Sequence, residues 1–309
     1  MRNRVKTVML LGAMTAFIIL VGKLIGGNAG MVIAFVLAAG MNFFSYWYSD
    51  RMVLRMYKAR EVNESQAPEL YDMVKELARR AGMPMPRVYV IPEEAPNAFA
   101  TGRNPEHAVV AVTEGLLNTM NRDEVMGVLA HEIAHVQNRD MLIGTIAATM
   151  AGAVMILASM ARWSMIFGGL SGDDDEGGGF FATLLMAILA PIAAVLIQMA
   201  ISRSQEYSAD AAGARLMGRS EPLANALLKL GAHSRRKRMN ANPATAHMFI
   251  VNPLSGQSMA KLFSTHPPVE ERVARLRGTR PSTEANRRGA GTTGGDMEET
   301  AKEFWESMK

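Results

Sequence analysis

The sequence contains no cysteine, which excludes disulfides, thiolate nucleophiles, iron–sulfur clusters and every zinc site built from cysteine. Charge is also scarce, because only 20% of the 309 residues are Asp, Glu, Lys or Arg. Hydrophobic residues make up 49% of the chain, so the composition is neither that of a disordered protein nor that of a collagen. Any bound metal ion must be held by histidine, aspartate and glutamate.

The hydrophobic residues are concentrated in four blocks, each close to or above the roughly 20 residues that a helix needs to cross ~30 Å of hydrocarbon. The blocks run from about Val5 to Ile25, Met31 to Tyr48, Met141 to Gly168 and Phe180 to Ile201, and Arg162 alone interrupts the last two. We therefore predict four transmembrane helices. A cleaved signal peptide in place of the first, or a buried core helix in place of one of them, is the alternative.

The basic residues flank these blocks unevenly, and an excess of Lys and Arg marks the cytoplasmic side of a membrane. Three basic residues precede the first block and four follow the second, whereas the hairpin between them holds only Lys23. The second hairpin, Gly169–Gly179, holds the acidic run Asp173–Glu176 and no Lys or Arg. We expect both termini and both large polar parts to face the cytoplasm. The net charge of +4 lies mostly beside the blocks, which favours contact with a lipid bilayer and argues against nucleic-acid binding.

The blocks divide the chain into four parts. Residues 1–50 form an N-terminal transmembrane hairpin and 141–201 a second one, while 51–140 and 202–286 together form a cytosolic domain. Residues 287–309 are a flexible linker and a short amphipathic helix whose purpose the sequence does not indicate. The basic run Arg235–Arg238 has the pattern of a solvated face, with a lipid-headgroup contact as the alternative.

The cytosolic part shows both helical and extended patterns. Residues 67–81 and 121–138 have apolar side chains at helical spacing, and Asn121 with Glu124 is a capping-box pair at the start of the second helix. Residues 87–91, 97–102 and 107–113 are extended, which predicts a small sheet. The expected fold is membrane α-helical with an α+β, zincin-like cytosolic catalytic domain.

The second of these helices carries the motif His131-Glu132-Ile133-Ala134-His135. Two imidazoles four residues apart lie on one helical face, about 6 Å along the axis, so both can bind one Zn²⁺ while Glu132 projects beside them. A catalytic zinc needs a third protein ligand. Glu206 is the best candidate, because Asp210 follows one turn later and offers a carboxylate to a ligating imidazole. Ordinary surface acids on a helix are the alternative for both.

Three segments together resemble the HtpX-type membrane zinc metalloproteases, which are related to the CAAX prenyl proteases. They are His131–Asp140, Ser202–Asp210 and Ser264–Pro268, and the resemblance covers about Arg4–Arg277. It implies a multi-pass protein of the bacterial cytoplasmic (inner) membrane that removes misfolded or damaged membrane proteins. The segment from Arg287 onward does not match the family pattern.

The resemblance also implies roles for individual residues. It implies that His131, His135 and Glu206 bind one zinc ion per chain, with Glu132 as the general base. It implies that His266, with Arg272 as a second candidate, meets the negative charge of the tetrahedral intermediate. An edge strand made of Asn97, Ala98, Phe99 and Ala100 would hold the substrate in extended form. A structural loop histidine and a plain structural strand are the alternatives for these last two assignments.

Other functions remain to be weighed against this one. A specific protease that processes a membrane-associated or lipidated peptide would need the same catalytic residues. A metal transporter would need ionisable residues inside the spans, which hold almost none. A non-catalytic metal-binding scaffold would be marked by loss of Glu132 or of the third ligand, and neither is lost. The sequence does not indicate the oligomeric state, the regulation or the preferred peptide bonds.

Overall fold

The computed structural model describes residues 2–151, 203–236, 239, 241, 242, 244–253 and 266–279. The fourth predicted span, the acidic hairpin, the C-terminal linker and its helix lie outside these residues, as do the third span beyond Ala151 and the end of the basic run.

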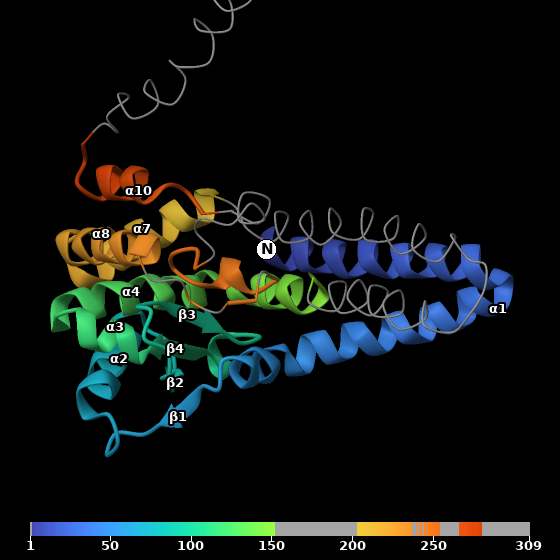
Figure 1. Ribbon diagram of the computed structural model, residues 1–309, viewed down its shortest axis with the longest axis horizontal. Helices are drawn as coiled ribbons and strands as arrows, with labels where there is room; N and C mark the ends of the chain where they lie inside the picture. Colours follow the sequence, from blue (N-terminus) through green and yellow to red (C-terminus); the bar gives the residue numbers. More distant parts are fainter. Residues whose placement is uncertain are drawn as a thin grey trace, which may run out of the picture.

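The first element, α1 (Arg2–Met56), doubles back on itself and forms two long arms (Figure 1). The turn lies at Gly27, whose φ of 58° is readily adopted only by a residue without a Cβ. Beyond the turn, Asn42 Nδ2 donates to Thr15 Oγ1 at 2.8 Å, which ties the arms together. The turn of this hairpin lies between the first two predicted spans, in the short gap between Ile25 and Met31.

Many large apolar side chains on the second arm are exposed, including Phe35, Phe43 and Phe44, each 55–58% exposed. Such a surface is unfavourable in water but is covered by lipid in a bilayer. The segment Gly27–Met56 is long and apolar enough to cross a membrane, and it alone meets that test within the described parts of the chain. The segments Thr7–Leu20 and Met141–Ala151 are shorter apolar helices. The count of four spans therefore stays a prediction.

A four-stranded sheet follows the hairpin, with the order β1-β2-β4-β3. Its strands are β1 (Arg60–Val62), β2 (Arg87–Ile91), β3 (Ala98–Thr101) and β4 (Val109–Thr113). The pair β2–β4 is parallel, whereas β1 and β3 run antiparallel to their neighbours. The sheet confirms the α+β class of the polar part. The third predicted strand, residues 107–113, is observed only from Val109, because Pro105–His107 forms a 3-10 turn. The sequence did not predict β1.

Both faces of the sheet are buried. Helices α2 (Pro68–Arg80), α4 (Arg122–Asn138) and α8 (Glu221–Arg236) cover one face. The five apolar residues that predict α2 are all buried there. The end of α1 covers the other face, where Tyr57, Phe99 and Phe249 form an aromatic cluster with centroids 5.1–6.2 Å apart. The described residues also form the helices α3 (Glu114–Thr119), α7 (Arg203–Met217), η2 (Ala246–Met248) and α10 (Val269–Leu276).

The close approach of α7 to α4 depends on a glycine. A Cβ added at Gly213 would lie 3.0 Å from the backbone nitrogen of His131, so a larger residue would push the two helices apart. Helix α7 ends just before Gly218, whose φ of 70° is left-handed and favours glycine at a helix C-terminus. The close packing places the first turns of α7 beside the histidine motif.

Candidate active site

The histidine motif lies on a well-anchored part of α4. Asn121 and Glu124 form the predicted capping box, with Asn121 Oδ1 accepting from the Glu124 backbone N–H at 3.0 Å. The helix ends at Arg139, which adopts a left-handed conformation with a φ of 58°. Nearly the whole helix is buried, because the sheet, α7 and α8 surround it.

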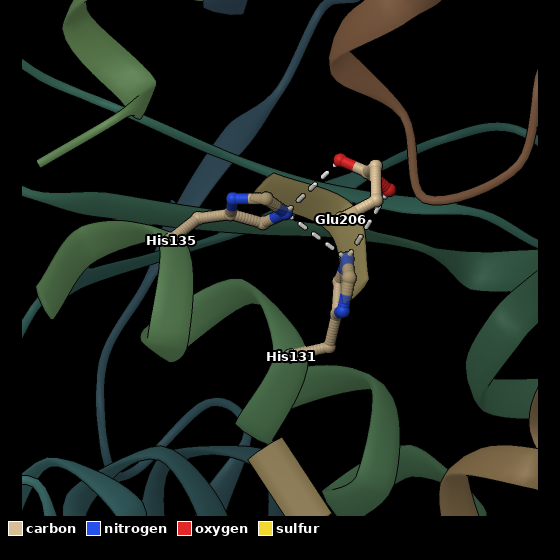
Figure 2. Close-up of side chains that lie close together, drawn as sticks. All are labelled: His131, His135 and Glu206. Atoms are coloured by element: carbon tan, nitrogen blue, oxygen red, sulfur yellow. Dashed lines mark hydrogen bonds and ion pairs between the residues drawn. The ribbon is translucent and has the colours of Figure 1, made fainter. Parts of the chain in front are cut away.

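Three side chains converge at this place (Figure 2). Nε2 of His131 and Nε2 of His135 are 3.1 Å apart, and the Glu206 carboxylate lies 3.9 Å and 3.4 Å from them respectively. One ligand atom from each residue lies within 4.8 Å of the others. Donors bound at 2.0–2.1 Å to one tetrahedral ion lie about 3.3 Å apart, so two nitrogens and a carboxylate at these distances fit zinc.

The charges around the cluster favour a bound cation. Burial opposes ionisation of Glu206, but the neighbouring His266 and His135 lower its pKa well below the usual value. Burial lowers the pKa of His131, which favours the neutral ring that a metal ligand requires. For His135 burial acts in the same direction, yet Asp140 and Glu206 outweigh it and raise its pKa well above the usual value. The site thus attracts positive charge, whether a proton or a metal ion.

Each motif imidazole also has a carboxylate behind it. Nδ1 of His131 lies 3.0 Å from Asp210 Oδ1, in the arrangement anticipated for Asp210. Nδ1 of His135 lies 3.2 Å from Asp140 Oδ2, a partner that the sequence analysis missed. The sequence held a signal for this contact, since Asp140 lies five residues after His135. The two side chains become spatial neighbours only because the chain turns at Arg139.

Arg272 lies behind the cluster of His131, His135 and Glu206. It is 1% exposed, and its guanidinium donates to both Asp210 oxygens at 2.9 and 2.7 Å and to the Ile250 carbonyl at 2.8 Å. Burial opposes ionisation of Asp210, but the charge of Arg272 lowers its pKa to about 2. Arg272 is not among the residues that line the cavity. This geometry does not support the predicted contact with the tetrahedral intermediate, because these hydrogen bonds direct the guanidinium toward the carboxylates.

Glu132 lies beside the cluster without being part of it. Burial raises its pKa to about 7, and the charge of Glu206 adds to the rise, while His135 and a hydrogen bond from the Ala100 backbone act against it. A carboxyl with a pKa near neutrality can both accept and return a proton. His266 also lines the cavity, with Nδ1 3.0 Å from Glu206 Oε2 and Nε2 2.9 Å from the His247 carbonyl.

The predicted substrate strand is only partly accessible. Asn97, Ala98 and Phe99 are buried, and only Ala100 lines the cavity. Although β3 ends the sheet, the Ile250 N–H donates to the Ala98 carbonyl at 3.0 Å. Asn97 Nδ2 also donates to the Val251 carbonyl at 2.9 Å. The edge is therefore already paired along Asn97–Ala98, and only the Ala100 end reaches the catalytic groups.

Comparison with known proteins identifies the family. The model of peptidase family M48 matches residues 64–280, which include every candidate residue described above. The chain belongs to peptidase family M48. A protein described as a protease HtpX homolog from Desulfatibacillum aliphaticivorans is 66% identical to this M48 chain over the full length of both. Another from Pyrococcus furiosus is 58% identical, covering 88% of this chain and 94% of its own.

The resemblance to HtpX-type membrane proteases is thereby confirmed. Among solved structures, Ste24p of S. mikatae matches this M48 chain with a TM-score of 0.48 and 20% sequence identity. The match covers 89% of this chain and 65% of that protein.

Proposed function

We propose that this M48 membrane protease is a zinc-dependent endopeptidase that cleaves cytosolic segments of misfolded or damaged membrane proteins. The observation that carries the proposal is the convergence of His131, His135 and Glu206 within 4.8 Å, beside the buried Glu132. A zinc ion held there would polarise the scissile carbonyl and make water more acidic.

The side chains of the site then divide the remaining work. Glu132 removes a proton from the attacking water, whose oxygen bonds to the scissile carbonyl carbon. When the C–N bond breaks, Glu132 passes the proton to the departing amine, so that one water is added across the peptide bond. His266 lines the same cavity, and it can donate a hydrogen bond to the carbonyl oxygen as negative charge develops there once Nε2 exchanges the His247 carbonyl for the substrate. Asp210, Asp140 and Arg272 hold the ligands in orientation.

The position of the site supports cleavage close to the bilayer. The helix Met141–Ala151 begins two residues after Arg139 ends α4, and it is the start of the third predicted span. Both ends of the α1 hairpin lie beside the catalytic part, and the turn lies far from it (Figure 1). This arrangement supports a cytoplasmic active site in the bacterial inner membrane, at which substrates meet the enzyme as they leave the lipid.

Replacing Glu132 by glutamine tests the chemistry. The variant should keep its metal but cleave a membrane-anchored reporter about a hundredfold more slowly or worse, because the base is removed and the ligands remain. Zinc content and turnover of the purified protein are the measurements. Glu64→Gln, at a side chain that is 61% exposed, is the control and should behave like the parent protein. Full turnover by Glu132→Gln would refute the role.

The same variant tests the substrate class. Membrane proteins that accumulate uncut around Glu132→Gln in cells, identified by mass spectrometry against Glu64→Gln, should be diverse and enriched under conditions that damage membrane proteins. Accumulation of one defined or lipidated peptide would instead identify a processing protease.

A further inference from the structure

The catalytic cavity, of about 60 Å³, is lined by two kinds of residue. The histidines and carboxylates of the site line it together with Gln205 and His247. The other lining residues are apolar: Ala100, Met141, Gly144, Met248, Phe249 and Ile250. Because both kinds line one cavity, a peptide bond held among the catalytic groups brings a neighbouring side chain of the substrate close to the apolar residues.

Gly144 lines this cavity, and within the described residues nothing requires a glycine there. It is helical, and among those residues a Cβ added at Gly144 would meet His247 Nε2 alone, at an ordinary contact distance of 3.9 Å. At Gly213 the corresponding contact is 3.0 Å from His131, and at Gly127 it is 2.7 Å from Leu223. A helical glycine costs about 1 kcal/mol relative to alanine, and in the described part of the chain neither a positive φ nor a close contact offsets that cost at Gly144.

The helix that carries Gly144, Met141–Ala151, is held at a fixed position beside the sheet. The next residue, Thr145, shares a hydrogen bond of 3.0 Å with Thr101 at the end of β3. On the other side, His247 Nε2 donates to the Gly144 carbonyl at 3.0 Å. These contacts fix the helix against both neighbouring segments. The helix therefore cannot move inward to fill the space that the missing side chain at Gly144 leaves.

We propose that Gly144 sets the size of an apolar specificity pocket, which admits an aliphatic side chain such as leucine next to the scissile bond. This inference rests on the proposed function and names the class of peptide bond that the enzyme prefers. A charged side chain is disfavoured because it would lose its hydration among the apolar lining residues. Transmembrane segments themselves are rich in aliphatic residues, so the preferred bonds are those where such a segment leaves the bilayer.

Two peptide series test the pocket, with alanine, leucine or lysine placed on one side or the other of the scissile bond. The full-length protein in detergent with zinc should cleave the leucine peptide of one series with a kcat/KM about tenfold or more above alanine and lysine. In Gly144→Leu the leucine-to-alanine ratio should fall about tenfold, because the new side chain fills the pocket. Gly144→Ala should lower the same ratio by a smaller factor.

The control is Gly12→Leu, which places the same side chain in open space on α1 and should keep the parental ratio. An unchanged ratio in both Gly144 variants, or a preference of the parent enzyme for lysine, would overturn the pocket. Gly144→Ala keeps the test valid if the leucine variant misfolds, since alanine favours the helix. Glu132→Gln is run on every peptide. If Glu132→Gln still cleaves the peptides, the proposed function is refuted. If Glu132→Gln abolishes cleavage but the Gly144 variants leave the leucine-to-alanine ratio unchanged, only the specificity pocket is refuted.

Discussion

The two motif histidines differ in how the surrounding residues support them. His131 is 1% exposed and faces Asp210, which is itself held by Arg272, whereas the side chain of His135 is 17% exposed and faces Asp140. A carboxylate behind a ligating imidazole fixes the tautomer and makes the opposite nitrogen a better ligand. The inner ligand thus rests on a buried ion pair, and the outer one on a residue at the junction with a membrane helix.

Asp140→Asn should weaken zinc binding about 10- to 100-fold, because an amide is a poorer acceptor for the His135 ring proton than a carboxylate. Competition with a chelator of known affinity measures the loss without relying on activity. The control is Asp123→Asn, the same change at a half-exposed position of α4. Equal zinc affinity in the two variants would show that Asp140 does not support the ligand.

Glu206→Ala should lower the zinc content of the purified protein as well as its activity, because it removes the only ligand that α7 supplies to the cluster. Elemental analysis after dialysis is the measurement. Ser208→Ala, an exposed change on the same helix, should retain the parental zinc content. A full zinc complement in Glu206→Ala would mean that another acid completes the site.

At the scale of elements, the packing of α4 against α7 determines whether a site exists. Gly213 allows the two backbones to approach at the level of His131, and the same approach sets where Glu206 lies relative to both imidazoles. Metal geometry and helix packing are therefore coupled through one small residue.

Gly213→Val should destabilise the protein by about 1–3 kcal/mol and reduce zinc affinity, because the added atoms force the helices apart. Thermal unfolding followed with and without added zinc measures both effects. Ala211→Val places the same β-branched residue on the exposed side of α7 and controls for helix propensity. If the two variants unfold alike, the close approach is not a determinant of stability.

The edge of the sheet shows the same dependence on tertiary structure. From sequence, Asn97–Ala100 is an extended segment that could pair with a peptide. In the folded protein, the Ile250 N–H already pairs with the Ala98 carbonyl. Only the Ala100 end lines the cavity, so a substrate has at most a short stretch of strand to pair with.

At the scale of the whole molecule, the catalytic part lies at one end of a long apolar hairpin (Figure 1). Arg51 and Arg55 stand where the second arm meets this part, on the side that the distribution of basic residues predicts to be cytoplasmic. This arrangement supports the proposal that the protein meets its substrates at a lipid boundary.

A topology reporter tests this arrangement. An enzyme that is active only in the cytoplasm, inserted in the acidic hairpin 169–179, should stay inactive, because the hairpin is expected outside. The same reporter inserted at the exposed Glu64 should be active. The reverse pattern would overturn the proposed orientation and place the catalytic groups on the outer side.

The sequence by itself determined that His131 and His135 share one helical face with Glu132 beside them, and it determined the apolar hairpin, because helical periodicity and the thickness of a bilayer act on neighbouring residues. The position of Glu206 could be anticipated only as a candidate, and three contacts were not anticipated: Asp140 with His135, Arg272 with Asp210, and Ile250 with the edge of β3. These features depend on contacts between segments that are distant in the chain or separated by a turn. Only the packing of α7 on α4, and of the Ile250 segment on β3, decides which polar groups meet.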